Sequence, residues 1–454
     1  NYEMKHILHC FALYSFIAIF IYFSIQTSSS EVEISLFERY GTFGAILLYV
    51  WRFLPVLILP QCLFHLVGLT FFNPFKKKIS LKAVPLLSPF VCFRVVTRGL
   101  YPRLVKENII LNMETCKNAG MANFMFEIVT DNRLNLPAMQ LVREIVVPPS
   151  YETKSGALFK ARALQYCLEE EVNRLQDSDW VVHLDEETLL TTNSVCGILN
   201  FVEDGKHQFG QGVITYANGE IVNWFATLSD TYRVSDDLGK LRTQLSIFHK
   251  PLFGWKGSFV VSKYGAERTI SWDHGPDGSI AEDTFFALIA QQAGYSFNYV
   301  EGEMLEKSPF TIIDFLQQRK RWLEGLLLCV HAREIRLPHR IPLASAVYTF
   351  LFAPLMFLQV LLLPYLHFPR VLPLEMIIAF LAAINIYMHV FGVCVSFNKK
   401  YRKNFLLLFV YCIGSCITIL FTVFIESAAV FLYLFGPKKT FYIVQKETTP
   451  LIDV

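Results

Sequence analysis

The sequence has few charged residues and almost no excess of either sign. Only 18% of its 454 residues are charged, and 41 Lys and Arg against 39 Asp and Glu leave a formal net charge of +2. Without a basic field the chain cannot hold a nucleic-acid backbone, which excludes nucleic acid as its main partner. The remaining composition, 53% hydrophobic and 15% aromatic, is too apolar for a soluble globule of this length and indicates a membrane protein.

Several short motifs are also missing. The 10 cysteines form no C-x-x-C pair, so neither a disulfide framework nor a zinc site is predicted. Many of them lie in apolar stretches, as packing residues do: Cys10, Cys62, Cys329, Cys394, Cys412 and Cys416. No G-x-x-x-x-G-K-[ST] loop and no G-x-G-x-x-G turn occurs. A ligand that carries phosphate must therefore be held by other groups.

Several stretches are apolar and long enough to cross a bilayer, which takes about 20 residues. They are residues 7–26, 43–75, 345–368, 372–397 and 405–435. The last is longer than one span needs and carries Glu426, so it is either one tilted helix or a helix with an interfacial piece. We therefore expect two transmembrane helices within 1–78, about three within 341–437, and a polar tail at 438–454.

The charges beside these spans predict the side that the rest of the chain faces. Basic clusters at 76–78 and 399–403 follow the second and fourth spans, whereas acidic residues dominate 31–38 after the first. Because cytoplasmic loops are enriched in Lys and Arg, both clusters and the middle region are expected in the cytosol. The C-terminus stays open, since five spans would place it in the lumen whereas Lys438 and Lys439 favour the cytosol.

The middle region, residues 79–340, predicts one α/β domain that is long enough to bury a single core. Short apolar runs typical of buried strands occur at 89–97, 124–130 and 180–184, with helical patterns between them. Strands that alternate with helices favour a mostly parallel sheet, in which ligands bind beyond the carboxyl ends of the strands. Asp131 and Asp185 follow two of these strands and are expected at that edge.

The run Asp185-Glu186-Glu187 is the first candidate for chemistry. Alternation along an extended chain places Asp185 and Glu187 on one side and Glu186 on the other. Two carboxylates so placed suit Mg²⁺ or Mn²⁺ bound to a diphosphate. The alternative is a solvated turn or a helix cap, for which Thr188 would serve as the capping residue.

Two further segments carry candidate residues. Glu282 and Asp283 open an apolar helical run, where Asp283 could act as a general base for a hydroxyl or could merely complement the helix dipole. In the segment 318–322, Arg321 can pair with diphosphate oxygens and Trp322 offers a flat face to a sugar. The alternative for this segment is an interfacial helix near 314–330, whose Arg and Trp side chains reach the lipid headgroups.

The three motifs resemble those of membrane-bound family 2 glycosyltransferases. That family has D-x-D, [T]-E-D and Q-x-x-R-W in this order, and the chain has Asp185-x-Glu187, Glu282-Asp283 and Gln318-x-x-Arg321-Trp322. Glu187 replaces the second Asp but keeps a carboxylate, and Ala281 stands where Thr is usual. The resemblance implies a GT-A-type fold, with the α/β domain inserted between transmembrane helices.

A closer resemblance is to the Egghead-type β-1,4-mannosyltransferases of invertebrate glycosphingolipid synthesis. It is carried by residues 94–99, 156–166, 183–188, 209–212 and 315–322, and it runs over nearly the whole chain. This resemblance implies GDP-mannose as donor, the glucose of glucosylceramide as acceptor, and a membrane of the endoplasmic reticulum or Golgi with the catalytic domain facing the cytosol. It also implies an inverting transfer assisted by Mn²⁺ or Mg²⁺. The oligomeric state is not predicted.

The same resemblance implies roles for further residues. It implies that several residues contact the nucleotide and diphosphate of the donor: Thr97, Arg98, Asp131, Lys160 and Gln318. Lys154 is an alternative to Lys160 for the diphosphate, and Arg162 stands where Gly is usual. It also implies that Trp255, Gly257 and Trp322 contact the acceptor sugar. The structural alternatives are that the lysines are solvated and that Gly257 forms an ordinary turn.

Two other functions fit parts of the sequence. A processive synthase of the cellulose or chitin type would share all three motifs, but about five spans are few for a polymer channel. A transporter or receptor with a cytosolic module is the other. Its weakness is that the charged residues inside the spans (Arg52, Glu375 and Glu426) are few and form no pathway.

Overall fold

A computed structural model describes residues 2–29, 35–75, 78–82, 84, 86–137, 139–397, 404–439 and 442–446. The basic residues at 76–77 and 399–403 and the acidic residues Glu31 and Glu33 lie outside these ranges. The chain forms two compact units: an apolar helical unit of residues 1–76, 228–243 and 342–437, and an α/β unit of residues 77–227, 244–341 and 438–454. Residues 228–243, from the middle of the chain, group with the apolar helices, and the C-terminal tail groups with the α/β unit.

The apolar unit consists of long helices. Its elements are α1 (Tyr2–Ser29), α2 (Leu36–Phe53), η1 (Leu54–Ile58), α3 (Leu59–Phe71), α13 (Ala353–Leu362), α14 (Leu372–Ser396) and α16 (Phe405–Phe435), together with most of α12 (Leu337–Leu351). By length and composition, 4 helices among the described residues can cross a membrane, or 5 if the pair α12 and α13, bent by 48°, is one span.

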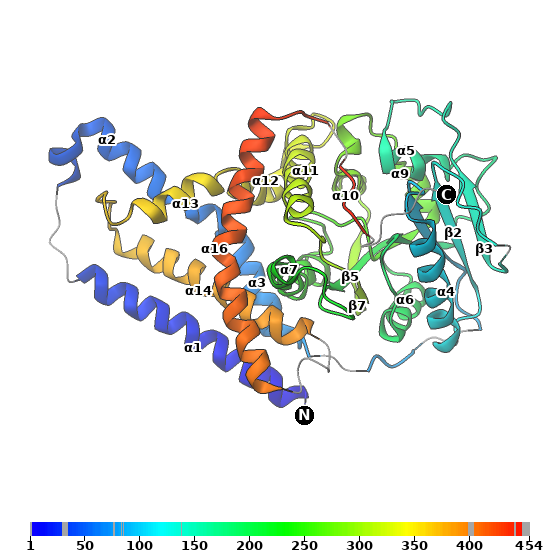
Figure 1. Ribbon diagram of the computed structural model, residues 1–454, viewed down its shortest axis with the longest axis horizontal. Coiled ribbons are helices and arrows are strands. Elements are labelled where there is room, and N and C mark those ends of the chain that lie inside the picture. Colours follow the sequence, from blue (N-terminus) through cyan, green and yellow to red (C-terminus); the bar gives the residue numbers. More distant parts are fainter. Residues whose placement is uncertain are drawn as a thin grey trace. The chain divides into compact units, whose positions relative to one another are not determined.

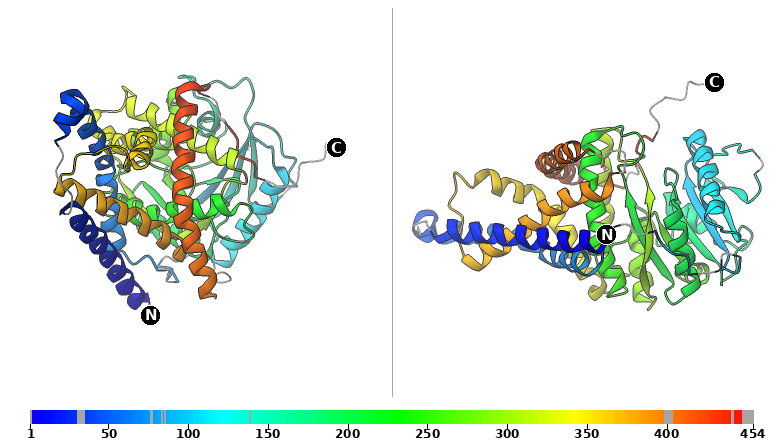
Figure 2. Two further views of the ribbon diagram at one scale, coloured as in Figure 1. Left: turned by 60° about the vertical axis from the view of Figure 1, so that its left-hand side comes forward. Right: turned by 90° about the horizontal axis from the view of Figure 1, so that it is seen from below.

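The last apolar stretch is one continuous helix. α16 has 31 residues, begins after the N-cap Asn404 and includes Glu426. Figures 1 and 2 show that α1 and α14 run alongside each other, whereas α16 runs across them. The axis of α16 is therefore not parallel to the axes of α1 and α14.

Residues from the middle of the chain pack closely against these helices. The segment comprises the end of α7 (Trp224–Asp236), the π-helix η2 (Asp237–Leu241) and the start of α8 (Arg242–Ser246). A Cβ atom on Gly68 of α3 would lie 2.1 Å from the carbonyl oxygen of Gly239, so only glycine permits this approach. Asp236 accepts from His65 at 2.6 Å and pairs with Lys240 at 2.9 Å. Close packing and a buried charge cluster thus tie residues 228–243 to the apolar unit.

Two of the charged residues of the spans, Arg52 and Glu375, pair with each other. Arg52 donates to both carboxylate oxygens of Glu375, at 2.6 and 3.1 Å, and to the side chain of Gln359 at 3.4 Å. The opposite charge of the partner compensates each of these ions for the loss of water, as is usual for charged residues inside a membrane. This pairing gives no support to a transport route.

The α/β unit is built on one sheet of seven strands in the order β3-β2-β1-β4-β6-β5-β7. The strands are β1 (Val91–Thr97), β2 (Phe124–Thr130), β3 (Val142–Val146), β4 (Trp180–Asp185), β5 (Phe209–Thr215), β6 (Val260–Lys263) and β7 (Phe297–Leu305). Only β6 pairs antiparallel to its neighbours. The predicted α/β class with a mostly parallel sheet is confirmed, and the carboxyl ends of β1, β2 and β4 meet at one edge.

Helices cover both faces of the sheet (Figure 1). They are α4 (Pro102–Asn118), α5 (Phe159–Tyr166), α6 (Thr192–Asp204), α9 (Tyr264–Ile270), η3 (Asp277–Ser279), α10 (Glu282–Gln292) and α11 (Ile312–His331). On one face Trp180 of β4 packs against Phe201 of α6, at 5.7 Å between rings. On the other face α5 contacts β1 and β2. The N-cap of α6 is Thr191, not the predicted capping residue Thr188.

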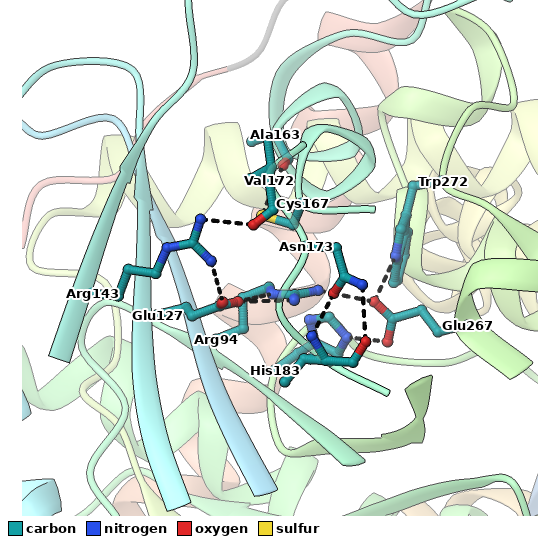
Figure 3. A network of polar contacts seen from close by, with 11 residues as sticks. Arg94, Glu127, Arg143, Ala163, Cys167, Val172, Asn173, His183, Glu267 and Trp272 are labelled. Carbon is teal, nitrogen blue, oxygen red and sulfur yellow. Dashed lines mark hydrogen bonds and ion pairs between the residues drawn. The ribbon is translucent and has the colours of Figure 1, made fainter. Parts of the chain in front are cut away.

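A row of buried charges crosses the α5 face of the sheet (Figure 3). Arg143, Glu127, Arg94 and His183 occupy the same register position on four adjacent strands, so their side chains share one face. Arg94 donates to Glu127 at 2.9 Å, and Glu267 from α9 accepts from Arg94 at 3.3 Å and from His183 at 2.8 Å. Each buried charge therefore has an opposite neighbour. This row lies two residues before Asp185 along β4.

Candidate active site

The carboxylate run lies in a tight turn where β4 ends. β4 stops at Asp185, and the amide of Thr188 closes the turn by donating to the carbonyl of Asp185 at 3.0 Å. Asp185 and Glu186 contact different elements, since Asp185 pairs with Lys160 of α5 whereas Glu186 accepts a hydrogen bond from the hydroxyl of Thr97 at the end of β1. Thr97, which the sequence had assigned to the donor site, is level with Glu186 in the pairing of β1 with β4, so the two side chains share a face, as strand alternation predicts.

Asp185 is neutralised by a lysine from α5. The ammonium of Lys160 lies 2.7 Å from Asp185 Oδ1 and also donates to the carbonyl of Gly257 at 3.1 Å. Burial alone would raise the pKa of Asp185, but Lys160 and then Lys446 lower it to about 2. The other candidate, Lys154, is exposed. The structure thus brings Lys160, rather than its rival, to the carboxylates.

Glu282 and Asp283 begin α10 and face the same point. A Cβ atom on Gly257 would lie 3.1 Å from Lys160 Nζ, 3.3 Å from Asp283 Oδ2 and 3.7 Å from Glu282 Oε1. Gly257 is therefore where the lysine and both carboxylates meet, and its missing side chain leaves room for a ligand beside them.

Burial changes the acidity of this carboxylate pair. It raises the pKa of Glu282, and repulsion by Asp283 adds to the effect, to a value of about 7. Burial also raises the pKa of Asp283, although the amide of Thr284, which donates to it at 2.6 Å, opposes the rise. A carboxyl group that titrates near neutrality suits general-base chemistry better than an ordinary surface carboxylate does.

Trp255 has a packing role in the structure. Its ring is buried and contacts Phe297 at 5.0 Å between centroids. Its amide donates to Thr284 Oγ1 at 3.3 Å, and the same hydroxyl donates to its carbonyl at 3.0 Å. These contacts fix the segment before Gly257 against α10, and the acceptor contact of Trp255 stays a prediction.

α11 carries the third motif, and one close contact fixes it against α10. A Cβ atom on Gly325 would lie 2.6 Å from that of Ala281, so the helix and the residue before α10 touch. This contact gives a physical reason for the small Ala281 where Thr is usual. Arg321 lies one turn earlier on the same side of α11. Its charge acts on Asp185, Glu282 and Asp283.

Two other residues of this motif lie nearby on α11. The side-chain oxygen of Gln318 is buried and accepts no hydrogen bond from any residue that the structure describes. The ring of Trp322 stacks on the guanidinium of Arg319 at 4.5 Å. A buried, unsatisfied oxygen is costly unless a ligand or water pairs with it, which agrees with a ligand-binding role for Gln318. The acceptor contact of Trp322 stays a prediction.

The remaining predicted residues lie at the ends of β1 and β2. Arg98 lies 3.7 Å from Asp131, and Arg162 of α5 lies 3.1 Å from the same carboxylate. Arg162 also donates to the carbonyls of Pro148 and Tyr151 at 3.1 and 2.9 Å, so its replacement of Gly serves a local structural purpose. Asp131 stands at the predicted sheet edge, and its contact with a nucleotide stays a prediction.

The sequence reasoning missed one residue of the site, Lys446 in the C-terminal tail. Its ammonium lies 2.5 Å from Glu187 Oε2 and 3.1 Å from Glu186 Oε1. Burial alone would lower the pKa of Lys446, but Glu187, Glu186 and Asp185 raise it. No local pattern distinguishes this lysine from the rest of a polar tail, because its partners lie 259 residues away.

The assembled side chains can bind cations and anions side by side. Asp185 and Glu187 offer hard oxygen ligands and already attract positive charge, since each is paired with an ammonium group. This donor set fits Mg²⁺ or Mn²⁺. The cations Lys160 and Arg321 could hold a diphosphate next to it, and Asp283 could remove a proton from a hydroxyl placed beside Gly257.

Comparison with known proteins gives consistent matches. Residues 180–435 match the family described as Glycosyl transferase family group 2. The chain is 59% identical over 450 residues to beta-1,4-mannosyltransferase bre-3 of Caenorhabditis briggsae, covering 98% of this chain and 99% of that protein. It is 53% identical over 457 residues to beta-1,4-mannosyltransferase egh of Drosophila melanogaster, covering 100% of both. Among solved structures, mannosyl-3-phosphoglycerate synthase from Rubrobacter xylanophilus has a TM-score of 0.31 and 12% identity, covering 56% of this chain and 76% of that one.

Proposed function

Because this chain belongs to the β-1,4-mannosyltransferases of glycosyl transferase family group 2, we propose that it transfers mannose from GDP-mannose to the glucose 4-hydroxyl of glucosylceramide. The observation that carries the proposal is the convergence of Asp185, Lys160, Gly257 and Asp283 on one point of the α/β unit. These residues come from four separate segments. Their convergence provides a cation site, an anion site and a base within a few ångströms.

The donor side of the proposal uses the carboxylate turn and two basic residues. Asp185 and Glu187 would hold Mn²⁺ or Mg²⁺, which when bound neutralises the diphosphate and favours the departure of GDP. Lys160 and Arg321 add positive charge where the leaving group gains negative charge. The unsatisfied oxygen of Gln318 could accept a hydrogen bond from a sugar hydroxyl of the donor, and Thr97, Arg98 and Asp131 line the sheet edge toward the nucleotide.

On the acceptor side, Asp283 accepts the proton of the attacking hydroxyl. The hydroxyl oxygen forms a bond to the anomeric carbon of mannose as the bond to the diphosphate oxygen breaks. A single displacement of this kind inverts the anomeric centre, so an α-linked donor gives a β-linked product. Gly257 leaves the space in which the acceptor sugar approaches the base, and Trp322 is the candidate for stacking on that sugar.

The membrane helices suit an acceptor whose lipid tails remain in the bilayer. The C-terminal segment groups with the α/β unit, so we infer that it faces the same side of the membrane as that unit. On this basis α1, the α2–α3 pair, the α12–α13 pair and α14 would cross the membrane, and α16 would lie along the interface. The α/β unit and both chain ends would then face the cytosol, at a membrane of the endoplasmic reticulum or Golgi.

One experiment tests the function. Membranes that contain the chain are supplied with glucosylceramide, Mn²⁺ or Mg²⁺, and a panel of labelled GDP- and UDP-sugars. We expect a single mannose on the lipid, from GDP-mannose alone. A polymer would instead identify a processive synthase, and the absence of transfer from every donor would favour a transporter or receptor.

A further inference from the structure

The C-terminal segment, residues 438–446, contacts the α/β unit at several points. Lys439 pairs with Asp277 at 2.6 Å, and its amide donates to Glu324. The hydroxyl of Tyr442 donates to Asp314 Oδ1 at 2.8 Å, and the amide of Gln445 donates to the same oxygen at 3.4 Å. These contacts hold the described residues at both ends of the segment.

The segment runs along α11 in the opposite direction to the helix. Glu324 and Asp314 are separated by about 15 Å of helix, and an extended chain from 439 to 445 spans up to about 20 Å. The described residues Lys439 and Tyr442 to Gln445 thus meet α11 at opposite ends of this stretch. Between them lie Gln318 and Arg321, which share one helical face with Asp314 by their spacing. The segment thus follows the face of α11 that carries the donor-site motif.

The segment ends, among its described residues, with Lys446 on the second carboxylate of the proposed cation site. Its ammonium lies 2.5 Å from Glu187 and 3.1 Å from Glu186, and its side chain is 19% exposed. A divalent cation bound to Glu187 would occupy the position that the ammonium group of Lys446 now takes beside this carboxylate. The two positive charges cannot occupy that position together. Cation binding must therefore move the ammonium group.

The anchors limit where Lys446 can go. Tyr442 and Gln445 hold the main chain at Asp314, so the flexible side chain of Lys446 can swing while its backbone stays. The site nearby contains the negative charge of the donor diphosphate once the donor is bound. We propose that Lys446 is a donor-site residue that neutralises Glu187 in the empty enzyme and pairs with the donor diphosphate when a divalent cation takes that carboxylate. This inference rests on the proposed function.

The test measures binding by the full-length protein in detergent, with wild type compared with Lys446→Ala. Mn²⁺ alone is titrated first and followed by electron paramagnetic resonance, and GDP is then titrated in saturating Mn²⁺. We expect Mn²⁺ to bind about fivefold more tightly to Lys446→Ala, because no ammonium competes for Glu187. GDP should bind about fivefold more weakly, because one cation of the diphosphate site is lost.

Lys206→Ala is the matched control. Lys206 makes an exposed ion pair with Asp204 at the start of β5, at the opposite edge of the sheet, so this variant loses the same charge without touching the site. It should bind both ligands as wild type does. Failure of wild type and control to bind Mn²⁺ and GDP would count against the proposed function, whereas the comparison with Lys446→Ala addresses the role of Lys446 alone.

A second variant guards against misfolding. Tyr442→Phe keeps every charge but removes the hydroxyl that anchors the segment to Asp314, so both shifts should appear in the same directions and be smaller. Only tighter Mn²⁺ binding combined with weaker GDP binding supports the proposal. If Mn²⁺ affinity is unchanged or lower in both variants, or GDP affinity is unchanged, Lys446 does not exchange partners and the proposal is wrong.

Discussion

Replacing Gly257 by alanine tests the geometry of the site with a single methyl group. Gly257 has no positive φ angle, so its backbone accepts alanine without strain. The new Cβ atom would meet Lys160 Nζ at 3.1 Å and Asp283 Oδ2 at 3.3 Å, closer than ordinary contact. Both neighbours are ends of flexible side chains, so they can shift by a few tenths of an ångström and the fold should persist.

The expected loss follows from this displacement. A misplacement of 1 Å in a catalytic group can cost about 10²-fold in rate, so a shift of roughly half that size should lower kcat/KM about tenfold. The methyl group also takes acceptor space, which adds to the loss. The assay is transfer of labelled mannose to glucosylceramide by detergent-purified protein, with the thermal unfolding midpoint measured on the same sample.

Gly294→Ala is the complementary control. Gly294 follows α10, has φ of +89° and has nothing within 4 Å of the added Cβ atom. The left-handed backbone should cost about 1 kcal/mol of stability while transfer is unaffected. A Gly257→Ala protein that transfers mannose at the wild-type rate would refute the convergence of base and lysine on this residue.

Other predictions concern protons, buried charge and the cation. Burial raises the pKa of Asp283 above its ordinary value, so the base becomes protonated and kcat/KM should fall as the pH decreases. The pKa of Glu282 is also raised, to about 7, and Glu282→Gln removes this neighbouring charge and should move the fall in kcat/KM to lower pH. A kcat/KM that does not change as the pH decreases would contradict the assignment. Arg94→Met removes the fully buried cation between Glu127 and Glu267, which keep Arg143 and His183 as partners, and should cost about 3 kcal/mol in unfolding experiments. Arg103→Met, at an exposed ion pair, should cost less than about 1 kcal/mol. Equal losses would contradict the role of the buried row. Chelation should abolish transfer, and Mn²⁺ or Mg²⁺ should restore it; activity that survives exhaustive chelation would rule out a cation at the carboxylate turn.

Local sequence pattern was sufficient for the elements that carry the site. Apolar, β-branched runs end at Asp131 and Asp185, and these runs are strands β2 and β4 of the sheet. The run at Glu282 opens a helix as predicted. Such features depend on neighbouring residues, so the sequence alone could predict them.

The features that sequence reasoning missed depend on contacts between distant residues. Residues 228–243 group with the apolar helices through contacts such as Gly239 against Gly68, and no apolar run marks them. Lys446 reaches the site only because the tail follows α11. Each of these features requires the packed fold to be known.

The transfer rate of Asp283→Asn with bound donor tests the proposed chemistry most directly. The substitution keeps the shape of the side chain and removes its ability to accept a proton. We expect a single-turnover rate about 10²–10⁴-fold below that of wild type, with GDP-mannose affinity and thermal stability nearly unchanged. A folded Asp283→Asn protein that transfers mannose at close to the wild-type rate would show that Asp283 is not the base.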